Sequence, residues 1–359
     1  MLLLNEQDVR RLVRGASILG VGGGGDPKYG MDLLISDLKR GRSLQLVDLE
    51  ELGSGMVVTP YFAGSLSPDE REFKEAFPLS YMMDALNSLE DKVGCVTEGI
   101  IPTEIGGGNT AIALHIAAEL RLPVGDADHV GRGAPELIHS TFHLAGIPLT
   151  PAAVATHMGD VILVEKCSSA ERYEKIVRSL SLLSGGRVFV VDTPVLVETA
   201  LKVSIRGSIS KAIDLGSAVE EALSLSEDPA EEAASFLEGK VVLRGQIADV
   251  DLRKEGGFLV GTYKVKGDGV SLEIHVKNEN IAAFWSYGEP AVLPPDLIIV
   301  MNDDGWGVVN SDLEGGMEVS VIAAPAPLQW RTEAGLAVMG PKHFGFDLDY
   351  IPVEVLLGE

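Results

Sequence analysis

Apolar residues recur along the first 165 residues with two alternating spacings. Apolar side chains return every three or four positions, as in amphipathic helices, in residues 5–19, 28–40, 68–89 and 110–120. Between these runs lie short extended segments rich in branched apolar residues, at 44–48, 56–62, 95–98, 124–126 and 161–165. Because helices and strands alternate throughout, we predict an α/β domain in this part of the chain.

The spacing changes after residue 165. Residues 169–238 are mainly helical, with helices expected at 170–183, 194–201, 209–225 and 231–238. Apolar and polar positions then alternate in six segments, at 241–252, 257–265, 270–278, 280–288, 296–302 and 318–324. Gly, Pro, Asn and Asp recur between these segments about every ten positions, which is typical of a β-sandwich or a barrel.

These patterns predict two domains. The first is the α/β domain, residues 1–165, and the second covers residues 166–359. In the second domain a helical segment (169–238) precedes a β-rich, sandwich- or barrel-like part (240–325). We expect the tail, residues 329–359, to pack back on the first domain. The length of 359 residues agrees with two domains, because single cores stop growing near roughly 250–300 residues.

Composition narrows the classes of partner. The chain is 46% hydrophobic, which argues against disorder, and 53 acidic against 29 basic residues give a net charge of −24. Such a charge disfavours nucleic acid and anionic membrane surfaces, but it leaves anionic small molecules open. The two cysteines, Cys95 and Cys167, are too few for a disulfide framework. With no apolar run of about 18 residues, we expect a cytoplasmic protein.

A glycine cluster follows the first predicted helix. Its spacing matches G-x-G-x-x-G, but a helix precedes it where the dinucleotide fingerprint needs a strand. We therefore favour a backbone-lined pocket for an anion or a carbonyl, in which Gly23, Gly24 and Gly25 present amide groups. The next helix, opening after Asp26, would point its positive end toward the loop. The alternative is a tight connection between two helices.

Residues 98–157 concentrate polar side chains and hold five of the seven histidines. Asp126 and Asp128 follow a short predicted strand and would point the same way at its carboxyl end. Two close carboxylates form an acid–base pair or a site for a divalent metal, and Arg132 would neutralise them or bind a substrate carboxylate. The alternative for both aspartates is turn and capping chemistry.

A second glycine turn lies in the same region. Glu104 and Asn109 flank it before an apolar helix, so Glu104, Gly107, Gly108 and Asn109 are candidate substrate-binding residues. His139 and His143 lie four residues apart, but the glutamate of the metalloprotease helix motif is missing. We therefore expect both histidines to pack in the core. His157 lies in a loop, where a functional and a structural role are equally open.

The C-terminal stretch 329–346 is dense in aromatic and basic residues. Trp330 and Phe344 would cover a flat ligand, while Arg331, Lys342 and His343 would meet its charged or polar edge. Ordinary packing between domains explains the same residues equally well.

Several segments in series resemble one family. GVGGGGDP, EIGGGNT, PVGDADHVGRGAPEL, PAPLQWRT, GPKHFGF and DLDYIPVE follow one another in the order found in the S-methyl-thiohydantoin desulfurase-like family. The resemblance covers almost the whole chain. It implies an α/β N-terminal portion, a β-rich C-terminal portion and the hydrolytic removal of a thiol from a cyclic S-methyl-thiohydantoin, which leaves a hydantoin.

That reaction requires an activated water and a proton donor. We assign the base, or a metal ligand, to Asp126 or Asp128 and the proton donor to His157, with Arg132 orienting acids or substrate. Residues of the two glycine turns would donate to the ring carbonyls. The sequence does not settle whether a divalent metal takes part.

A second hypothesis is a non-catalytic ligand-binding or regulatory partner of a hydantoinase- or oxoprolinase-type enzyme. The expected partners are a small-molecule substrate and, beyond it, a second copy of the chain or such an enzyme.

Overall fold

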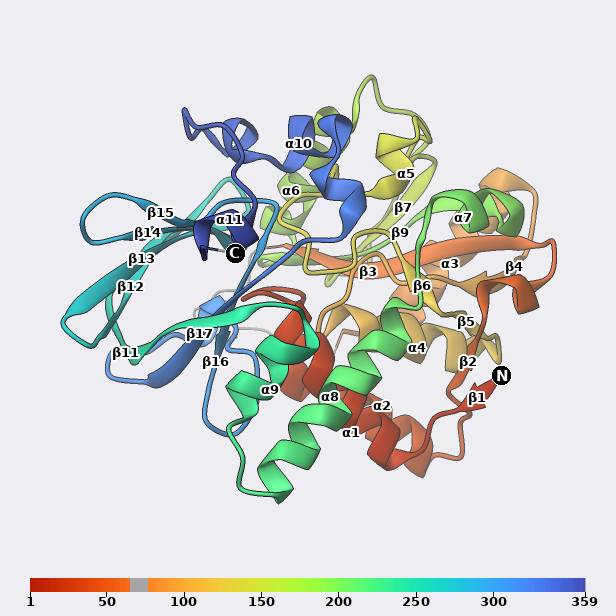
Figure 1. Ribbon diagram of the computed structural model, residues 1–359. Helices are drawn as coiled ribbons and strands as arrows, with labels where there is room; N and C mark the ends of the chain where they lie inside the picture. Colours follow the sequence, from red (N-terminus) through yellow and green to blue (C-terminus); the bar gives the residue numbers. More distant parts are fainter. Residues whose placement is uncertain (65–76, 359) are drawn as a thin grey trace.

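Two β-sheets organise the chain (Figure 1). A computed structural model describes residues 1–64 and 77–358. The helix expected at 68–89 falls partly outside these residues, and the described helix in this region, α3, is Leu79–Val93. In the described part of the chain, no helix combines the length and the apolarity needed to cross a membrane.

The first sheet has eight strands in the order β1-β2-β5-β4-β3-β9-β7-β8. The four central strands from β2 to β3 are parallel, and the others pair antiparallel. Their bounds are β1 Leu2–Leu3, β2 Gln45–Val47, β3 Met56–Gly64, β4 Thr97–Ile100, β5 Val124–Gly125, β7 Ala152–Thr156, β8 Val161–Val164 and β9 Arg187–Leu196. The predicted α/β character of the N-terminal part is confirmed.

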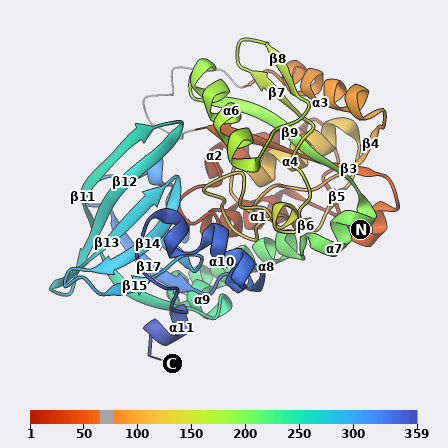
Figure 2. The ribbon, with the colours of Figure 1, turned by 90° about the horizontal axis from the view of Figure 1, so that it is seen from above.

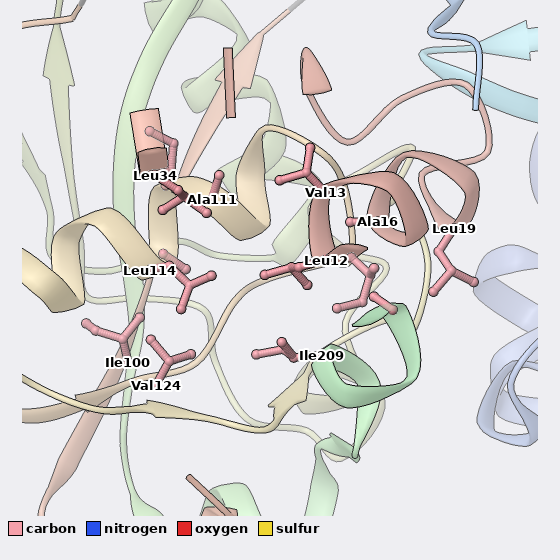
Figure 3. Close-up of a cluster of buried hydrophobic side chains, with 14 of the residues drawn as sticks. Leu12, Val13, Ala16, Leu19, Leu34, Ile100, Ala111, Leu114, Val124 and Ile209 are labelled. Atoms are coloured by element: carbon pink, nitrogen blue, oxygen red, sulfur yellow. The ribbon is translucent and has the colours of Figure 1, made fainter. Parts of the chain in front are cut away.

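Helices pack against this sheet and between the two sheets, and they build the main core. They are α1 Glu6–Leu19, α2 Pro27–Lys39, α3, α4 Asn109–Leu120, α5 Thr141–Leu144, α6 Ala170–Leu183, α7 Val197–Val203, α8 Ser208–Ser224 and α9 Pro229–Phe236. Helix α4 is buried from Asn109 to Ala118, because its apolar residues surround the helix instead of forming one stripe. Figure 3 shows Leu12 of α1, Leu114 of α4 and Ile209 of α8 in this core, where all three are at most 1% exposed.

Helices α1 and α8 cross in direct backbone contact. A Cβ atom on Gly15 would lie 1.8 Å from the carbonyl oxygen of Ala212, and one on Gly216 would lie 1.9 Å from that of Arg11. The two glycines therefore allow the helices to approach closely. This crossing ties the helical segment to the first layer of the molecule.

The second sheet has seven antiparallel strands in the order β15-β14-β13-β12-β11-β17-β16 and curls into a half-barrel (Figure 2). Its strands are β11 Lys240–Glu255, β12 Phe258–Gly267, β13 Val270–Lys277, β14 Glu279–Trp285, β15 Pro290–Val292, β16 Leu297–Met301 and β17 Glu318–Ala324. All six predicted segments correspond to strands, and β15 was missed. The concave face buries aliphatic side chains and Tyr263.

The prediction that residues 169–238 are mainly helical overlooked two strands, the long strand β9 and the two-residue strand β10, Ile205–Arg206. Strand β9 lies in the middle of the first sheet, between β3 and β7, and the helix expected at 194–201 begins only at Val197. The sequence RVFVVDTPVL explains the difference, because its branched and aromatic residues favour a buried strand. The first sheet thus takes strands from both sides of residue 165.

Short elements complete the chain. A two-stranded ribbon joins β6 Ala127–Asp128 to β10 Ile205–Arg206. The C-terminal tail contains α10 Glu333–Met339, a 3-10 turn at Pro341–Phe344 and α11 Val353–Leu356. In the tail, Trp330 is fully buried, and its indole N–H donates to the carbonyl oxygen of Val130 at 2.7 Å.

Candidate active site

The two glycine turns of the sequence cross each other. The carbonyl oxygen of Gly24 accepts hydrogen bonds from the amides of Gly108 and Asn109, both at 3.0 Å. A Cβ atom on Gly24, whose φ is +72°, would lie 2.5 Å from the Cα atom of Gly106. We call this contact the glycine crossing. The amides of Gly108 and Asn109 therefore donate within the protein, which agrees with the alternative of a tight connection between two helices.

The other turn residues lie close around the crossing. The amide of Gly23 donates to the carbonyl oxygen of Gly20 at 2.8 Å. A Cβ atom would lie 2.9 Å from the Cα atom of Gly108 if it were added to Gly25, and 2.7 Å from the Cβ atom of Pro27 if it were added to Gly107. The turn positions therefore have no room for side chains of their own, and the two backbones pack directly against each other.

Glu279, the first residue of β14, inserts its carboxyl group at the glycine crossing. A Cβ atom on Gly23 would lie 1.9 Å from its Oε1 atom, and the amide of Gly24 donates to that atom at 3.3 Å. The other oxygen, Oε2, is buried and has no hydrogen-bond partner among the described residues. Burial, and then the charge of Glu104, raise the pKa of Glu279 to about 8 against the pull of Arg132 and Arg178.

Glu104 is the second carboxylate of this site. It is 5% exposed, and it accepts hydrogen bonds from the side-chain amide of Asn109 at 2.6 Å and from the backbone amide of Ala134. Burial raises the pKa of Glu104, whereas these two donors favour the charged form. Glu104 thus has two close hydrogen-bond donors, whereas Glu279 has one distant donor.

Arg132 connects this site to the second sheet. Its buried guanidinium donates to the carbonyl oxygens of Pro295 at 2.6 Å and of Asn280 at 3.4 Å. Burial lowers the pKa of Arg132 to about 10, which leaves it charged at neutral pH. Its positive charge lies close enough to favour the charged forms of both Glu104 and Glu279.

A groove of about 240 Å³ adjoins the hairpin that carries Glu279. It is lined by Val260, Gly261, His275, Val276, Lys277, Ile281, His343, Phe344 and Phe346. Lys277 pairs in register with Glu279, so the groove reaches the end of the hairpin where β14 begins, while the buried Glu279 carboxyl group lies outside its lining. The volume admits a small heterocycle, and the wall combines two phenyl rings with cationic and imidazole groups.

One wall of the groove carries a polar cluster. The Lys277 ammonium contacts one carboxylate oxygen of Glu136, and Nε2 of His343 lies 3.1 Å from the other. The ligand atoms that Glu136, His139 and His343 offer all lie within 4.8 Å of one another, so among the described residues these three could hold a metal ion.

Asp126 and Asp128 stabilise the backbone. Asp126 accepts from the amides of Ile209 and Ser210, both at 3.0 Å, and from the Ser210 hydroxyl, and thus caps the start of α8. Asp128 accepts from the amides of Val130 at 2.9 Å and of the following glycine at 2.6 Å. Burial raises the pKa of Asp128 to about 7. Neither aspartate lines the groove.

The histidines occupy separate environments. The ring of His157 lies edge-on to Phe77, with 5.2 Å between ring centroids, and its backbone amide donates to Ser184 at 2.8 Å. His139 is 1% exposed and packs on Phe344. His143, for which we also expected core packing, is only partly buried. Of the sequence candidates, the structure therefore brings together the glycine turns, Glu104, Asn109 and Arg132. Asp126 and His157 do not join them.

The sequence analysis missed Glu279, Lys277 and Glu136. A signal for the first two existed, because VKNEN interrupts two apolar strand patterns with five residues of which four are polar. A glutamate at the start of a buried strand requires an explanation, since buried carboxylates are rare unless they are paired. In the C-terminal stretch, His343 and Phe344 do line the groove, whereas Arg331 pairs with Asp296 and Glu354.

Comparisons with known proteins agree with this architecture. A search of curated proteins finds no match. A solved structure, the X-ray crystal structure of a protein from Chromobacterium violaceum, is 23% identical and superposes with a TM-score of 0.81. The match covers 98% of this chain and 100% of the other, so the two proteins share one fold.

Two family models cover almost the whole sequence. The S-Me-THD-like N-terminal domain matches residues 7–166, and the S-Me-THD-like C-terminal domain matches residues 168–353. These are the two parts of the family that the serial motifs resemble. The chain therefore belongs to the S-Me-THD-like family, the S-methyl-thiohydantoin desulfurase-like family.

Proposed function

We propose that this protein hydrolyses a cyclic thiohydantoin-type small molecule and releases a thiol. One observation carries the proposal: two buried carboxyl groups, Glu104 and Glu279, lie near the glycine crossing, close enough for the charge of Glu104 to raise the pKa of Glu279, and have unequal hydrogen bonding. Unequal surroundings separate the pKa values of two such groups and thereby assign one as base and the other as acid. Family membership supports the substrate class.

The proposed reaction uses Glu104 in its ionised form and Glu279 in its protonated form. Water attacks C2 of an S-methyl-thiohydantoin while the Glu104 carboxylate accepts a proton from it. The tetrahedral adduct then breaks its C2–S bond, and protonated Glu279 gives its proton to the departing sulfur. The remaining hydroxyl proton moves to the ring nitrogen that was double-bonded to C2, which leaves the C2 carbonyl and a ring N–H. The proton taken up by Glu104 then returns to Glu279 and resets the pair. The products are a hydantoin and methanethiol, with all atoms of substrate and water accounted for.

The groove supplies a place for the ring. Phe344 and Phe346 offer flat apolar surfaces, and Lys277 offers a cation for a ring oxygen or a carboxylate substituent. We place the acid and the base at Glu279 and Glu104, instead of at the aspartates and His157, because the other candidates make structural contacts. Both carboxylate oxygens of Asp126 already hold α8, Asp128 accepts from two backbone amides, and His157 packs on Phe77.

Glu279→Gln tests the proposal. The amide keeps the shape of the side chain but has no acidic proton to give, so kcat for thiol release should fall about 10²–10⁴-fold. The wild-type rate should decline as the pH rises through about 8, where Glu279 loses its proton. Thiol release is measured with a thiol reagent on a panel of S-alkyl thiohydantoins.

A matched control is Asp192→Asn. Asp192 is also buried with a raised pKa, of about 6, but it accepts from Tyr61 and Tyr173, away from the glycine crossing. This variant should keep its turnover. Unchanged turnover in folded Glu279→Gln would overturn the assignment of the acid. Binding of the panel without thiol release would favour the ligand-binding role.

A further inference from the structure

Glu136, His139 and His343 form a cluster that the proposed reaction does not use. The first two lie in the loop before α5, and His343 comes from the C-terminal 3-10 turn. Nε2 of His343 lies 3.1 Å from Oε2 of Glu136, and the rings of the two histidines are 5.4 Å apart. Residues far apart in the sequence thus bring two imidazoles and one carboxylate together.

The orientation of His139 suits a metal ligand. Nε2 of its ring lies 2.8 Å from the carbonyl oxygen of Val338 and donates to it, and Nδ1 lies 3.1 Å from the amide nitrogen of Glu136. Nδ1 is therefore the unprotonated nitrogen and carries the lone pair. Histidines that bind metals donate their other ring N–H to a carbonyl in this way. A cation at Nδ1 would replace only the bond from the Glu136 amide.

Lys277 already provides a positive charge at the cluster. Its ammonium contacts Oε1 of Glu136, whose side chain is largely buried and needs a counter-cation. The Lys277 side chain is 34% exposed and lines the groove, so it can leave Glu136 and move into the solvent. Lys277 and a metal ion would therefore compete for the same carboxylate.

We propose that Glu136, His139 and His343 form a divalent-cation site, selective for zinc, which opens on the groove. Two imidazoles and a carboxylate suit zinc better than magnesium or calcium, which prefer oxygen ligands. Three protein ligands leave one position for water, as in catalytic zinc sites, and His343 places that position at the groove wall. The proposal is independent of the acid–base pair.

Titration of the purified full-length protein with Zn²⁺ or Co²⁺ tests this site. Calorimetry should show one equivalent bound, and Co²⁺ should give the visible absorption bands of a four-coordinate site. His343→Ala and Glu136→Gln should weaken binding by roughly tenfold or more. Removing a residue that only supports a metal ligand already costs about that much, and these two residues would be ligands themselves. Lys277→Met removes the competing ammonium and should tighten binding several-fold.

His275→Ala is the matched control, because His275 lines the same groove outside the cluster and should leave affinity unchanged. The net charge of −24 allows weak binding to surface acids, which the cluster variants would not affect. Binding that His343→Ala and Lys277→Met leave unaltered would therefore overturn the site, as would no binding at all. His139 is buried, and a His139→Ala variant that fails to fold would give no binding data. His343 is partly exposed, so the His343→Ala variant tests the site without that problem.

Discussion

Glu279 and Asp126 are both buried carboxyl groups next to backbone amides, yet their surroundings give them different properties. Asp126 accepts three hydrogen bonds at the start of α8, whereas Glu279 accepts one at 3.3 Å and keeps one oxygen without a described partner. Hydrogen bonds to the charged form are what hold a buried carboxylate ionised. Asp126 is therefore engaged in holding the backbone of α8, whereas Glu279 keeps one oxygen that no described residue uses.

The raised pKa of Glu279 predicts a pH-dependent stability. The group titrates near 4.5 when unfolded and at about 8 when folded, so between these values the unfolded chain releases a proton that the folded chain retains. This contribution to stability is complete below about pH 4.5 and is lost as the pH rises through 8. Glu279→Gln removes it, so the melting temperature of this variant relative to wild type should rise from pH 5 to pH 8.

Asp192→Asn again provides the comparison. Because the pKa of Asp192 is about 6, its difference in melting temperature from wild type should stop changing above that pH. Melting curves of all three proteins at pH 5, 6.5 and 8 measure both trends. If the difference in melting temperature between Glu279→Gln and wild type were the same at all three pH values, Glu279 would be ionised in the folded protein throughout this range.

At the scale of elements, the sequence predicts what depends on local pattern. Apolar periodicity is sufficient to place α1 and the long strands β11 to β14, because each buries a repeating face, and the continuous apolar run is sufficient to place α4. Periodicity also places α8 to within one residue, but it does not reveal how that helix is capped, because the preceding residue is Gly207 and the capping carboxylate comes from Asp126. A capping partner about 80 positions away leaves no local signal.

Asp126→Ala should destabilise the start of α8. Loss of a helix cap costs about 0.5–2 kcal/mol, and three accepted hydrogen bonds place Asp126 at the upper end of that range. Urea unfolding measures the loss. Asp228→Ala is the control, since Asp228 caps α9 in a more exposed position and should cost less. Reduced thiol release with unchanged stability would instead return Asp126 to the chemistry.

At the scale of the whole molecule, the candidate site exists only because the two sheets meet. Glu104 and the glycine turns belong to the first layer, whereas Glu279 opens β14 of the second. The sequence shows the glycine turns and polar residues 98–157 as candidates, but no periodicity pairs Glu104 with a residue in the other sheet. Prediction from pattern therefore identifies one half of the site and misses the other.

Arg132 is the connection between these halves that can be tested. Its guanidinium is buried and donates to backbone carbonyls of the second sheet and of the loop before β16, while its charge balances Glu104 and Glu279. Arg132→Met keeps the apolar stem but leaves those carbonyls without their donor and both carboxyl groups with Arg178 as the remaining cation. Loss of one partner from a buried ionic group costs about 3–5 kcal/mol, so the urea midpoint should fall sharply.

The matched control is Arg10→Met on α1. Arg10 pairs with Glu6 at an exposed position, where solvent screens the ion pair and leaves it little effect on stability. Both variants lose one guanidinium, so any difference between them reflects burial and not net charge. Equal losses would mean that Arg132 does not hold the sheets together. A large loss confined to Arg132→Met would show that the cation which balances the acid pair also joins the two layers.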